Sequence, residues 1–594
     1  MDWNLDSLFP SFRGPEMGEF IADLDRRIDA ASATFATLAT PAADNLDAWQ
    51  DALLDFEEIS RRLSHLGVYL GCLTAADSAN EEYAAEQARI SETGAKVATL
   101  GNSIETGLGQ ADDESFDQLK QRDALAGCGH WIELTRRRAR DRMSLPEENL
   151  AAALAVDGIQ AWGRLYNSVV GNLTFRMNAP DGTVQELPMA QWRSLSSHPD
   201  RAFRQAAFAG GNRAWESVGH TMKAAINGIC GTRLTLDSKR GTGHFLDPAL
   251  LDAGISRPTL DAMFEAIDQN LPLSRKAIRF KARRIGVDAV SWHDLEAAIP
   301  SPAGDGEISW ETACSWVSQA FHSGYPALGE FFDTYLENRW IDYSARPGKR
   351  PGGFCTTTNF TGESRVFMNF NGTVHDIMTL AHEIGHAFHS HILRDERPFA
   401  KRYPMTLAES ASTFAELILT EGLQQNDQVA PRVKELLVDE ELNHFTAFLL
   451  DIPVRFHFEK AFYERRASGE LGISELNELM VATQRRIFGD TLAHGEENPW
   501  YWASKMHFFI TGVRFYNFPY TFGYLLSRAL HRLKRQQGTD FLPRYQTYLE
   551  KSGSMTCEDL IRETLGEDIT TPEFWNQAIA TIDDLGIDFD PPAA

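Results

Sequence analysis

The chain has 594 residues, of which 43% are hydrophobic and 11% aromatic. A chain of this size and composition buries a large core, roughly three quarters of its unfolded surface, which excludes a disordered or low-complexity protein. Its 57 Lys and Arg residues against 83 Asp and Glu residues give a net charge of −26. The charge argues against nucleic acid as a partner, because a phosphate-binding surface needs a continuous basic stripe.

The remaining compositional signals favour a soluble, cytoplasmic protein. The six cysteines are scattered without a CxxC pair, which is typical of reduced thiols in a large, well-cored chain. Residues 1–6 are acidic and lack the apolar run of a secretory signal. No uncharged apolar stretch reaches the ~18 residues that a membrane helix needs, so we expect no membrane association. The oligomeric state is left open.

The N-terminal part is predicted to be helical and to end in a β-hairpin. Apolar residues recur every three or four positions from about 47 to 109 and again from about 146 to 169. Alternating segments at 173–177 and 183–187 then flank an Asp-Gly turn, which is typical of a hairpin. The polar stretch 195–199 that follows is the predicted boundary between two domains, 1–195 and 196–594.

Helical periodicity also dominates the remainder of the chain. The predicted features, in order, are helices over 201–332 interrupted at 239–243 and 300–306, a Gly/Pro-rich loop at 346–353, a β-like run at 364–370, and helices after 373 with turns near 469–472 and 495–499. Internal repeats and long linkers are absent from the sequence. The predicted fold class is therefore mainly α, with one small sheet near residue 365.

The most informative motif is H-E-x-x-H at His382, Glu383 and His386. Residues four apart on a helix lie on the same face, so the two imidazoles can bind one Zn²⁺ at ~2.1 Å. The intervening glutamate can then reach a metal-bound water as a general base. An apolar stripe and a capping box at Thr373 and Asp376 place the motif on a buried helix, which argues against a chance match in a loop.

A third metal ligand is expected downstream. The candidates are His389, His391 and a carboxylate on the predicted helix 405–423, of which Glu409 is preferred because its small neighbours allow two helices to approach closely. Glu416 lies two turns further on the same face and could orient a ligand. His389 as a fourth protein ligand would close the site and leave Glu383 without a role, so a supporting or structural position is favoured for it.

With these motifs the chain resembles the M3 family of zinc metallopeptidases, which includes thimet oligopeptidase-like enzymes, and specifically its oligoendopeptidase F branch. The resemblance rests on TLAHEIGHAFHS at 379–390, LAESAST at 407–413 and FYNFPYTFGYLLS at 515–527. It extends weakly to WNLDSLF at 3–9, SLPEEN at 144–149 and GKRPGGF at 348–354, and so covers nearly the whole chain. It implies that 196–594 is the catalytic domain, that one Zn²⁺ is bound per chain, and that a large helical shell surrounds a deep substrate channel beside a zincin-type helix.

The aromatic segment 501–524 provides candidate groups for transition-state stabilisation. Tyr516 and Tyr520 are four apart, and hydroxyls aimed at a scissile carbonyl stabilise the developing oxyanion by roughly 3 kcal/mol per donor. In the resembled family, tyrosines in the matching segment have this role, and Tyr524 is a weaker third candidate. The family also has a histidine five or six residues before the first tyrosine, whereas His507 here lies nine residues before Tyr516.

The resulting hypothesis is a zinc-dependent oligoendopeptidase that acts on short unfolded peptides. Residues 365–370 are interpreted as an edge strand that pairs with the substrate backbone. Two alternatives stay open. A zinc carboxypeptidase or dipeptidyl carboxypeptidase would have the same metal motif, whereas an aminopeptidase lacks support because no G-x-M-E-N segment is present. A catalytically dead peptide-binding protein is disfavoured by the presence of Glu383 beside all three ligands.

Overall fold

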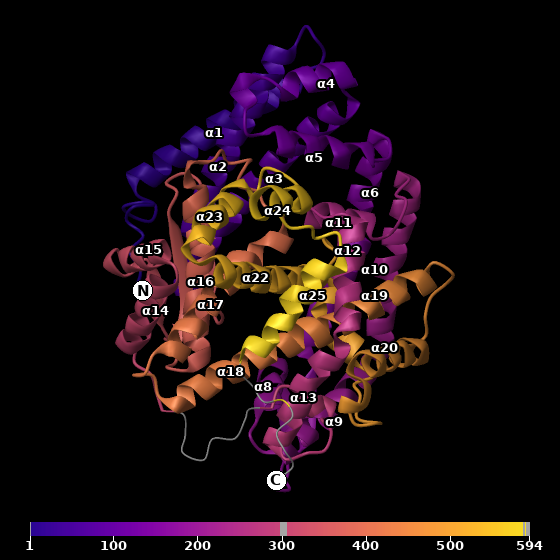
Figure 1. Cartoon of the computed structure of the whole chain (residues 1–594). Coiled ribbons are helices and arrows are strands. Elements are labelled where there is room, and N and C mark those ends of the chain that lie inside the picture. Colours follow the sequence, from indigo (N-terminus) through magenta and orange to yellow (C-terminus); the bar gives the residue numbers. More distant parts are fainter. Residues whose placement is uncertain (1, 298–305, 586–588, 590–594) are drawn as a thin grey trace. The chain divides into compact units, whose positions relative to one another are not determined.

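Helices form most of the structure, as the periodicity predicts (Figure 1). The computed structural model describes residues 2–297, 306–585 and 589. The chain divides into two compact units, each made of three segments that are distant in the sequence. The first unit comprises Met1–Asp141, Gly306–Lys434 and Ser527–Asp568. The second comprises Arg142–Asp305, Glu435–Leu526 and Ile569–Ala594.

The first unit contains the H-E-x-x-H helix. Its helices are α1 (Pro15–Phe35), α2 (Leu46–Ala76), α3 (Glu81–Gln110), α4 (Asp113–Lys120), α5 (Gly129–Arg140), α14 (Trp310–Gly324), α15 (Pro326–Glu337), α16 (Val374–Ile392), α17 (Met405–Gln425), α23 (Phe541–Lys551) and α24 (Cys557–Leu565). Helices α18 (Pro431–Thr446) and α22 (Phe518–Gln537) each begin in one unit and end in the other. The helices predicted over 47–109 are confirmed as α2 and α3, which Asn80 separates by capping the start of α3.

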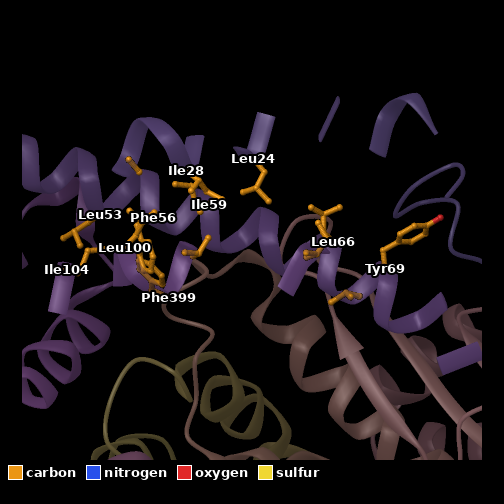
Figure 2. Close-up of a cluster of buried hydrophobic side chains, with 14 of the residues drawn as sticks. Leu24, Ile28, Leu53, Phe56, Ile59, Leu66, Tyr69, Leu100, Ile104 and Phe399 are labelled. Atoms are coloured by element: carbon orange, nitrogen blue, oxygen red, sulfur yellow. The ribbon is translucent and has the colours of Figure 1, made fainter. Parts of the chain in front are cut away.

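An apolar core joins the N-terminal helices of this unit (Figure 2). Its labelled members are Leu24, Ile28, Leu53, Phe56, Ile59, Leu66, Tyr69, Leu100, Ile104 and Phe399. Phe399, from the loop after α16, stacks on Trp131 of α5 with ring centroids 3.9 Å apart. Each fully buried side chain of this size contributes ~1.5–3 kcal/mol to folding, so the core fixes the segment after α16 to the N-terminal helices.

A three-stranded sheet lies against α16. Its strands are β3 (Ile341–Ser344), β4 (Phe354–Thr357) and β5 (Ser364–Phe370), in the order β3-β5-β4. Strand β5 is parallel to β3 and antiparallel to β4. The small sheet predicted near residue 365 is confirmed, but the interpretation of 365–370 as an edge strand is wrong. β5 is central because its buried apolar run pairs on both sides, and β4 borders the sheet.

A buried ammonium group anchors the Gly/Pro-rich loop to this sheet. Lys349 Nζ donates hydrogen bonds to Asp342 Oδ1 at 3.0 Å and to the Met368 carbonyl at 2.6 Å, and its side chain is fully buried. These bonds join β3 to β5 at an irregularity in their pairing between Asp342 and Ser344. A buried charge is tolerated here because it is paired and hydrogen-bonded. The loop that precedes β4 is therefore fixed at its base.

The second unit contains the predicted hairpin and the aromatic segment. Its helices are α6 (Leu145–Asp157), α7 (Ile159–Asn172), α8 (Met189–Ser194), α9 (Arg201–Ser217), α10 (Gly219–Arg240), α11 (Asp247–Ala253), α12 (Arg257–Gln269), α13 (Leu271–Ile285), α19 (Ile452–Arg466), α20 (Ile473–Phe488), α21 (Tyr501–Ser504) and α25 (Pro572–Ala580). Strands β1 (Thr174–Asn178) and β2 (Val184–Pro188) pair antiparallel and confirm the hairpin, each one residue later than predicted. Gly182 has φ +86° in its turn, a conformation that favours glycine.

Most of the predicted helix boundaries agree with the structure. The block predicted at 146–169 is confirmed as α6 and α7, which meet at Gly158. The interruption at 239–243 follows the end of α10, where Gly241 adopts the left-handed conformation. Most of the interruption predicted at 300–306 lies outside the described residues. The domain boundary predicted near residue 195 stays a prediction, since the two units are defined by contacts and each combines distant segments.

Candidate metal centre

Helix α16 begins at the capping box that the sequence predicts. Oγ1 of Thr373 accepts a hydrogen bond from the Asp376 N–H at 3.1 Å, and Oδ2 of Asp376 accepts one from the Thr373 N–H at 3.0 Å. These bonds satisfy backbone donors that have no partner within the helix. The start of α16 is therefore fixed, and with it the direction in which His382 and His386 leave the helix.

Helices α16 and α17 approach each other to backbone contact. A Cβ atom at Gly385 would lie 2.6 Å from the Ala411 carbonyl oxygen and 2.6 Å from Ser412 Cα, so a larger residue would force the helices apart. Ser410, the next neighbour on α17, is fully buried. The small-residue patch predicted for helix 405–423 thus lies at the contact. This spacing lets a carboxylate on α17 reach the two histidines on α16.

Three potential ligand atoms converge between these helices. Nε2 of His382 lies 3.3 Å from Glu409 Oε2, and Nε2 of His386 lies 3.5 Å from the same oxygen. The two imidazole rings are nearly perpendicular, with centroids 4.8 Å apart. The side chains are 28%, 22% and 22% exposed, so an ion can reach all three. Among the described residues they form the group whose geometry suits a metal ion.

The separations agree with those of a tetrahedral zinc site. Ligand atoms about 2.1 Å from a tetrahedral ion lie about 3.4 Å apart, close to both measured distances. Two imidazole nitrogens and one carboxylate oxygen are also a donor set that zinc accepts, with a fourth position left for water or substrate. The residues present therefore fit a zinc ion.

A second layer of hydrogen bonds orients two of these ligands. Nδ1 of His382 lies 2.5 Å from Glu416 Oε1, and the Ser412 hydroxyl donates to Glu409 Oε2 at 3.0 Å. Burial alone would lower the pKa of His382, but its hydrogen bonds with Glu409 and Glu416 raise that pKa well above its usual value. Burial would raise the pKa of Glu409, yet its hydrogen bond with His382 lowers it to about 2. Glu409 is therefore a carboxylate at neutral pH.

His386 differs electrostatically from its partner. Burial, reinforced by the charge on His382, lowers the pKa of His386 to about 4. Its ring is neutral at physiological pH, which is the form that binds a metal. One of the two imidazoles could thus hold a metal ion as it stands, whereas His382 would have to release a proton to do so.

Glu383 lies beside the edge strand of the sheet. It is 7% exposed, and the backbone N–H of Cys355 on β4 lies close enough to oppose, in part, the effect of burial on the pKa of its carboxyl group. A Cβ atom at Gly353 would lie 3.4 Å from Glu383 Oε1, so glycine leaves the carboxylate room next to the strand. Burial raises the pKa of Glu383 to about 7. A carboxyl group with such a pKa both accepts and releases a proton near neutral pH.

His389 is not among the three converging ligands. It is fully buried, its Nε2 lies 2.9 Å from the Ser552 hydroxyl, and its ring stacks on Tyr403 with centroids 4.2 Å apart. Burial lowers the pKa of His389 to about 3, so its ring is neutral. Its contacts are those of a structural residue. His391, the other candidate, packs its ring against Phe331.

The second unit brings together the predicted histidine and tyrosines. The rings of Tyr516 and Tyr520 are nearly perpendicular with centroids 5.5 Å apart, and the His507 ring lies roughly parallel to that of Tyr516 at 6.1 Å. Tyr516 precedes α22, so the pair does not share a helix face; a turn places it beside Tyr520. Burial, with the charges of Arg455 and Lys505, lowers the pKa of His507 to about 4. Tyr524 is 1% exposed and stacks on Phe448 as a core residue.

Sequence reasoning missed a buried carboxylate next to this group. Glu459 on α19 is 3% exposed and accepts hydrogen bonds from the Phe515 N–H and the Asn517 amide. The available signal was its position among the apolar residues of that helix, since an acidic side chain on a buried face requires a partner. The identity of that partner comes from a segment more than fifty residues away and is not visible in the pattern.

Comparison with known proteins decides the family. Residues 194–581, more than half of the chain, match the model described as Peptidase family M3. The chain belongs to peptidase family M3. Residues 108–175 match a second model, described as Oligopeptidase F, and the resemblance to that branch is confirmed. As an M3 member the chain is related to metallopeptidases, and its His-His-Glu group is the candidate metal centre.

Full-length relatives support the same assignment. Oligopeptidase PepF of Bacillus subtilis is 23% identical over 586 residues, covering 96% of this chain and 84% of that protein. Group B oligopeptidase PepB of Streptococcus agalactiae is 23% identical, with 92% of each chain covered. Oligoendopeptidase-F from Enterococcus faecium is 19% identical, has a TM-score of 0.67, and the match covers 96% of this chain and 98% of that one. A protein from Chlamydophila abortus has a TM-score of 0.84 at 19% identity, covering 98% and 96%. At these identities the structural matches establish the fold.

The sequence predicts no membrane helix. None of the described helices combines the length and the apolar character that a membrane-crossing segment requires.

Proposed function

We propose that this M3 family member is a zinc-dependent oligoendopeptidase, which hydrolyses internal bonds of short unfolded peptides. The observation that carries the proposal is the convergence of His382, His386 and Glu409 at ligand distances that suit zinc. A zinc ion held there would supply a Lewis acid that activates water and polarises the scissile carbonyl. The remaining steps belong to side chains of this chain.

Glu383 is the proposed general base and acid. Its carboxylate takes a proton from the attacking water and passes it to the leaving amine, so the two steps return it to its starting state. Burial and the close approach of Gly353 hold the carboxylate beside β4. A side chain held in one place reacts without first being ordered, which lowers the entropic part of the barrier.

Tyr516, Tyr520 and His507 are the proposed transition-state donors. The hydroxyl groups would donate hydrogen bonds to the oxyanion that develops on the scissile carbonyl. His507 is neutral because of its low pKa, so one ring nitrogen carries a proton that it can donate. Support comes from the packing of the three rings against one another within the second unit.

Substrate binding is proposed to use the outer edge of β4, which pairs with no other strand in the described part of the chain. A peptide added there would pair through its main chain with little dependence on its side chains. The glycines that precede the strand, Gly352 and Gly353, carry no side chain and so leave room for a peptide backbone to approach this edge. We further propose that the helical bulk, with 1–195 as the N-terminal region and 196–594 as the catalytic domain, encloses a channel that selects substrates by length.

The test is cleavage of a quenched peptide capped at both ends, before and after removal of metal. We expect internal cleavage, loss of activity with a chelator, and recovery with one equivalent of Zn²⁺. Mass spectrometry of the products distinguishes the alternatives. A carboxypeptidase or dipeptidyl carboxypeptidase would leave the capped peptide intact and would cleave only a matching peptide with a free C-terminus. Peptide binding without hydrolysis, in zinc-loaded protein, would favour a catalytically dead binder and contradict the proposal.

A further inference from the structure

The turn that presents Tyr516 is strained. Phe515 has φ +53° and is one of three non-glycine residues with positive φ among those described. The left-handed conformation is unfavourable for a residue with a bulky side chain, so the surrounding structure has to impose it. The Phe515 side chain is fully buried, with its ring 5.2 Å from that of Tyr463 and 5.8 Å from that of Phe245.

Burial alternates along this turn. Phe515 and Asn517 are 0% and 1% exposed, whereas Tyr516 between them is partly exposed. Within the described part of the chain, the Tyr516 hydroxyl forms no hydrogen bond, whereas that of Tyr501 is bonded to Asp451 and Arg455. The two buried neighbours therefore fix the backbone and leave the Tyr516 hydroxyl available.

A single carboxylate holds both buried neighbours. Oε1 of Glu459 accepts a hydrogen bond from the Phe515 N–H at 3.0 Å, and Oε2 accepts one from Asn517 Nδ2 at 2.8 Å. Asn517 Oδ1 in turn accepts from the Phe518 N–H at 2.6 Å, where α22 begins. Glu459 thus connects α19 to the turn on both sides of Tyr516.

The preceding residues of the segment are held from α10. Arg233 donates hydrogen bonds to the carbonyls of Ile510 and Val513, both at 2.6 Å, and to the Tyr463 hydroxyl at 3.0 Å. Arg514 forms a two-pronged ion pair with Asp237. The Glu459 carboxylate is the group among these that contacts the strained residue itself.

We propose that Glu459 is a positioning residue for catalysis, whose carboxylate holds the Phe515–Asn517 turn so that the Tyr516 hydroxyl stays fixed. This inference rests on the proposed function, in which Tyr516 donates to the oxyanion. Its physical basis is the free-energy cost of burying a charged group. A buried carboxylate is expensive, and an apolar side chain of similar size would stabilise this core at least as well. A carboxylate, in contrast, satisfies two donors at once and imposes one backbone conformation.

The experiment is a double-mutant cycle in the zinc-loaded full chain. Glu459→Gln keeps the size but removes one acceptor, because the amide nitrogen cannot accept from Asn517. We expect kcat to fall by about tenfold to a hundredfold with KM little changed, as for a small displacement of a catalytic group. In the Tyr516→Phe variant, Glu459→Gln should lower kcat hardly further, because the hydroxyl that Glu459 positions is already gone.

Two further measurements separate positioning from simple stability. Hydrogen exchange of the amides in 510–518 should become faster in Glu459→Gln, while zinc stoichiometry stays at one per chain. Glu497→Gln is the matched control, since Glu497 is a buried carboxylate of the same unit that accepts the backbone N–H of Gly495 in its own loop, outside 510–518. It should leave kcat and exchange in 510–518 unchanged. If Glu459→Gln does not fold, Asn517→Ala tests the same contact from the other side.

The outcomes are distinguishable. The inference would be overturned if Glu459→Gln lowers kcat equally with and without the Tyr516 hydroxyl, or if hydrogen exchange in 510–518 is unchanged. Either result would leave the proposed function intact. Full activity of Tyr516→Phe alone would overturn both the inference and the proposed role of Tyr516. A loss of kcat that occurs only when Tyr516 is present, together with faster hydrogen exchange in 510–518, supports the inference.

Discussion

Glu416 on α17 accepts a 2.5 Å hydrogen bond from Nδ1 of His382 on α16. A carboxylate can only accept, so Nδ1 keeps its proton and Nε2 is the nitrogen that would give up its proton to bind a metal ion. The same contact fixes the plane of the ring. Glu416 is 5% exposed and therefore holds this geometry from within the core of the first unit.

Removal of this contact is expected to weaken metal binding. Glu416→Gln should lower zinc affinity by about 10- to 100-fold, because the amide neither fixes the tautomer nor stabilises the ring as strongly. Competition against a fluorescent chelator at constant pH measures the change. Glu421→Gln is the control: it lies on the same helix, is paired with Lys534 and His531, and should leave the affinity unchanged. Equal affinities for both variants would refute the role of Glu416.

Glu383→Gln should separate metal binding from catalysis. The side chain is not among the three converging ligand residues, so zinc should still bind with full stoichiometry. Loss of the base should lower kcat by about 10²- to 10⁴-fold. Metal analysis and peptide cleavage on the same preparation provide the check. A zinc-loaded variant with wild-type kcat would show that another group moves the proton.

Tyr516→Phe and Tyr520→Phe should each lower kcat by about 10²- to 10³-fold while KM changes little, since the hydrogen bonds form only in the transition state. The aromatic contacts between the two rings are retained in both variants. Tyr545→Phe removes a hydroxyl from a buried ring of the first unit and should leave the kinetics unchanged. Larger effects on KM than on kcat would indicate that the tyrosines bind substrate instead.

Gly385→Ala should separate α16 from α17. The added methyl group would lie 2.6 Å from backbone atoms of α17, which must shift by several tenths of an ångström. Overpacking of this kind costs about 1–3 kcal/mol of stability. We also expect weaker zinc binding, because Glu409 moves away from the two histidines. Thermal unfolding with and without zinc measures both effects. Gly67→Ala on α2, where a Cβ meets no atom within 4 Å, is the control.

Glu459 should make stability depend on pH in a defined direction. Burial raises its pKa to about 7, against hydrogen bonds from Phe515 and Asn517 and the charges of Arg233 and Arg514. The folded state therefore holds its proton more tightly than the unfolded state. The stability that this proton contributes is present at acid pH and is lost as pH rises from about 4.5 to 7.

Comparison with Glu459→Gln isolates this effect from other titrations. The variant should gain stability relative to the wild type across that interval, by at most about 3 kcal/mol. Chemical denaturation at several pH values between 4 and 8 measures the difference. A difference that stays constant with pH, or that changes in the opposite direction, would contradict the raised pKa.

The sequence by itself determined the elements whose signals are local. The H-E-x-x-H spacing, the capping box at Thr373 and the apolar stripe of α16 all lie within twenty residues, where helix geometry relates sequence position directly to direction in space. The β1–β2 hairpin was equally predictable, because its turn residues lie between its strands. The small residues around Glu409 also indicated which glutamate could approach the histidines.

Only the tertiary structure decided which distant groups meet. Strand β5 could not be distinguished from an edge strand, since pairing on its second side comes from β4 and not from its own pattern. The spacing of His507 and Tyr516 differed from that of the family, yet a turn brings their rings together. Glu459 looks like other helical glutamates in sequence, and the position of Glu416 indicated that it could orient a ligand but not which one. Their partners lie 56 and 34 residues away, and burial of a polar group is decided by such long-range contacts.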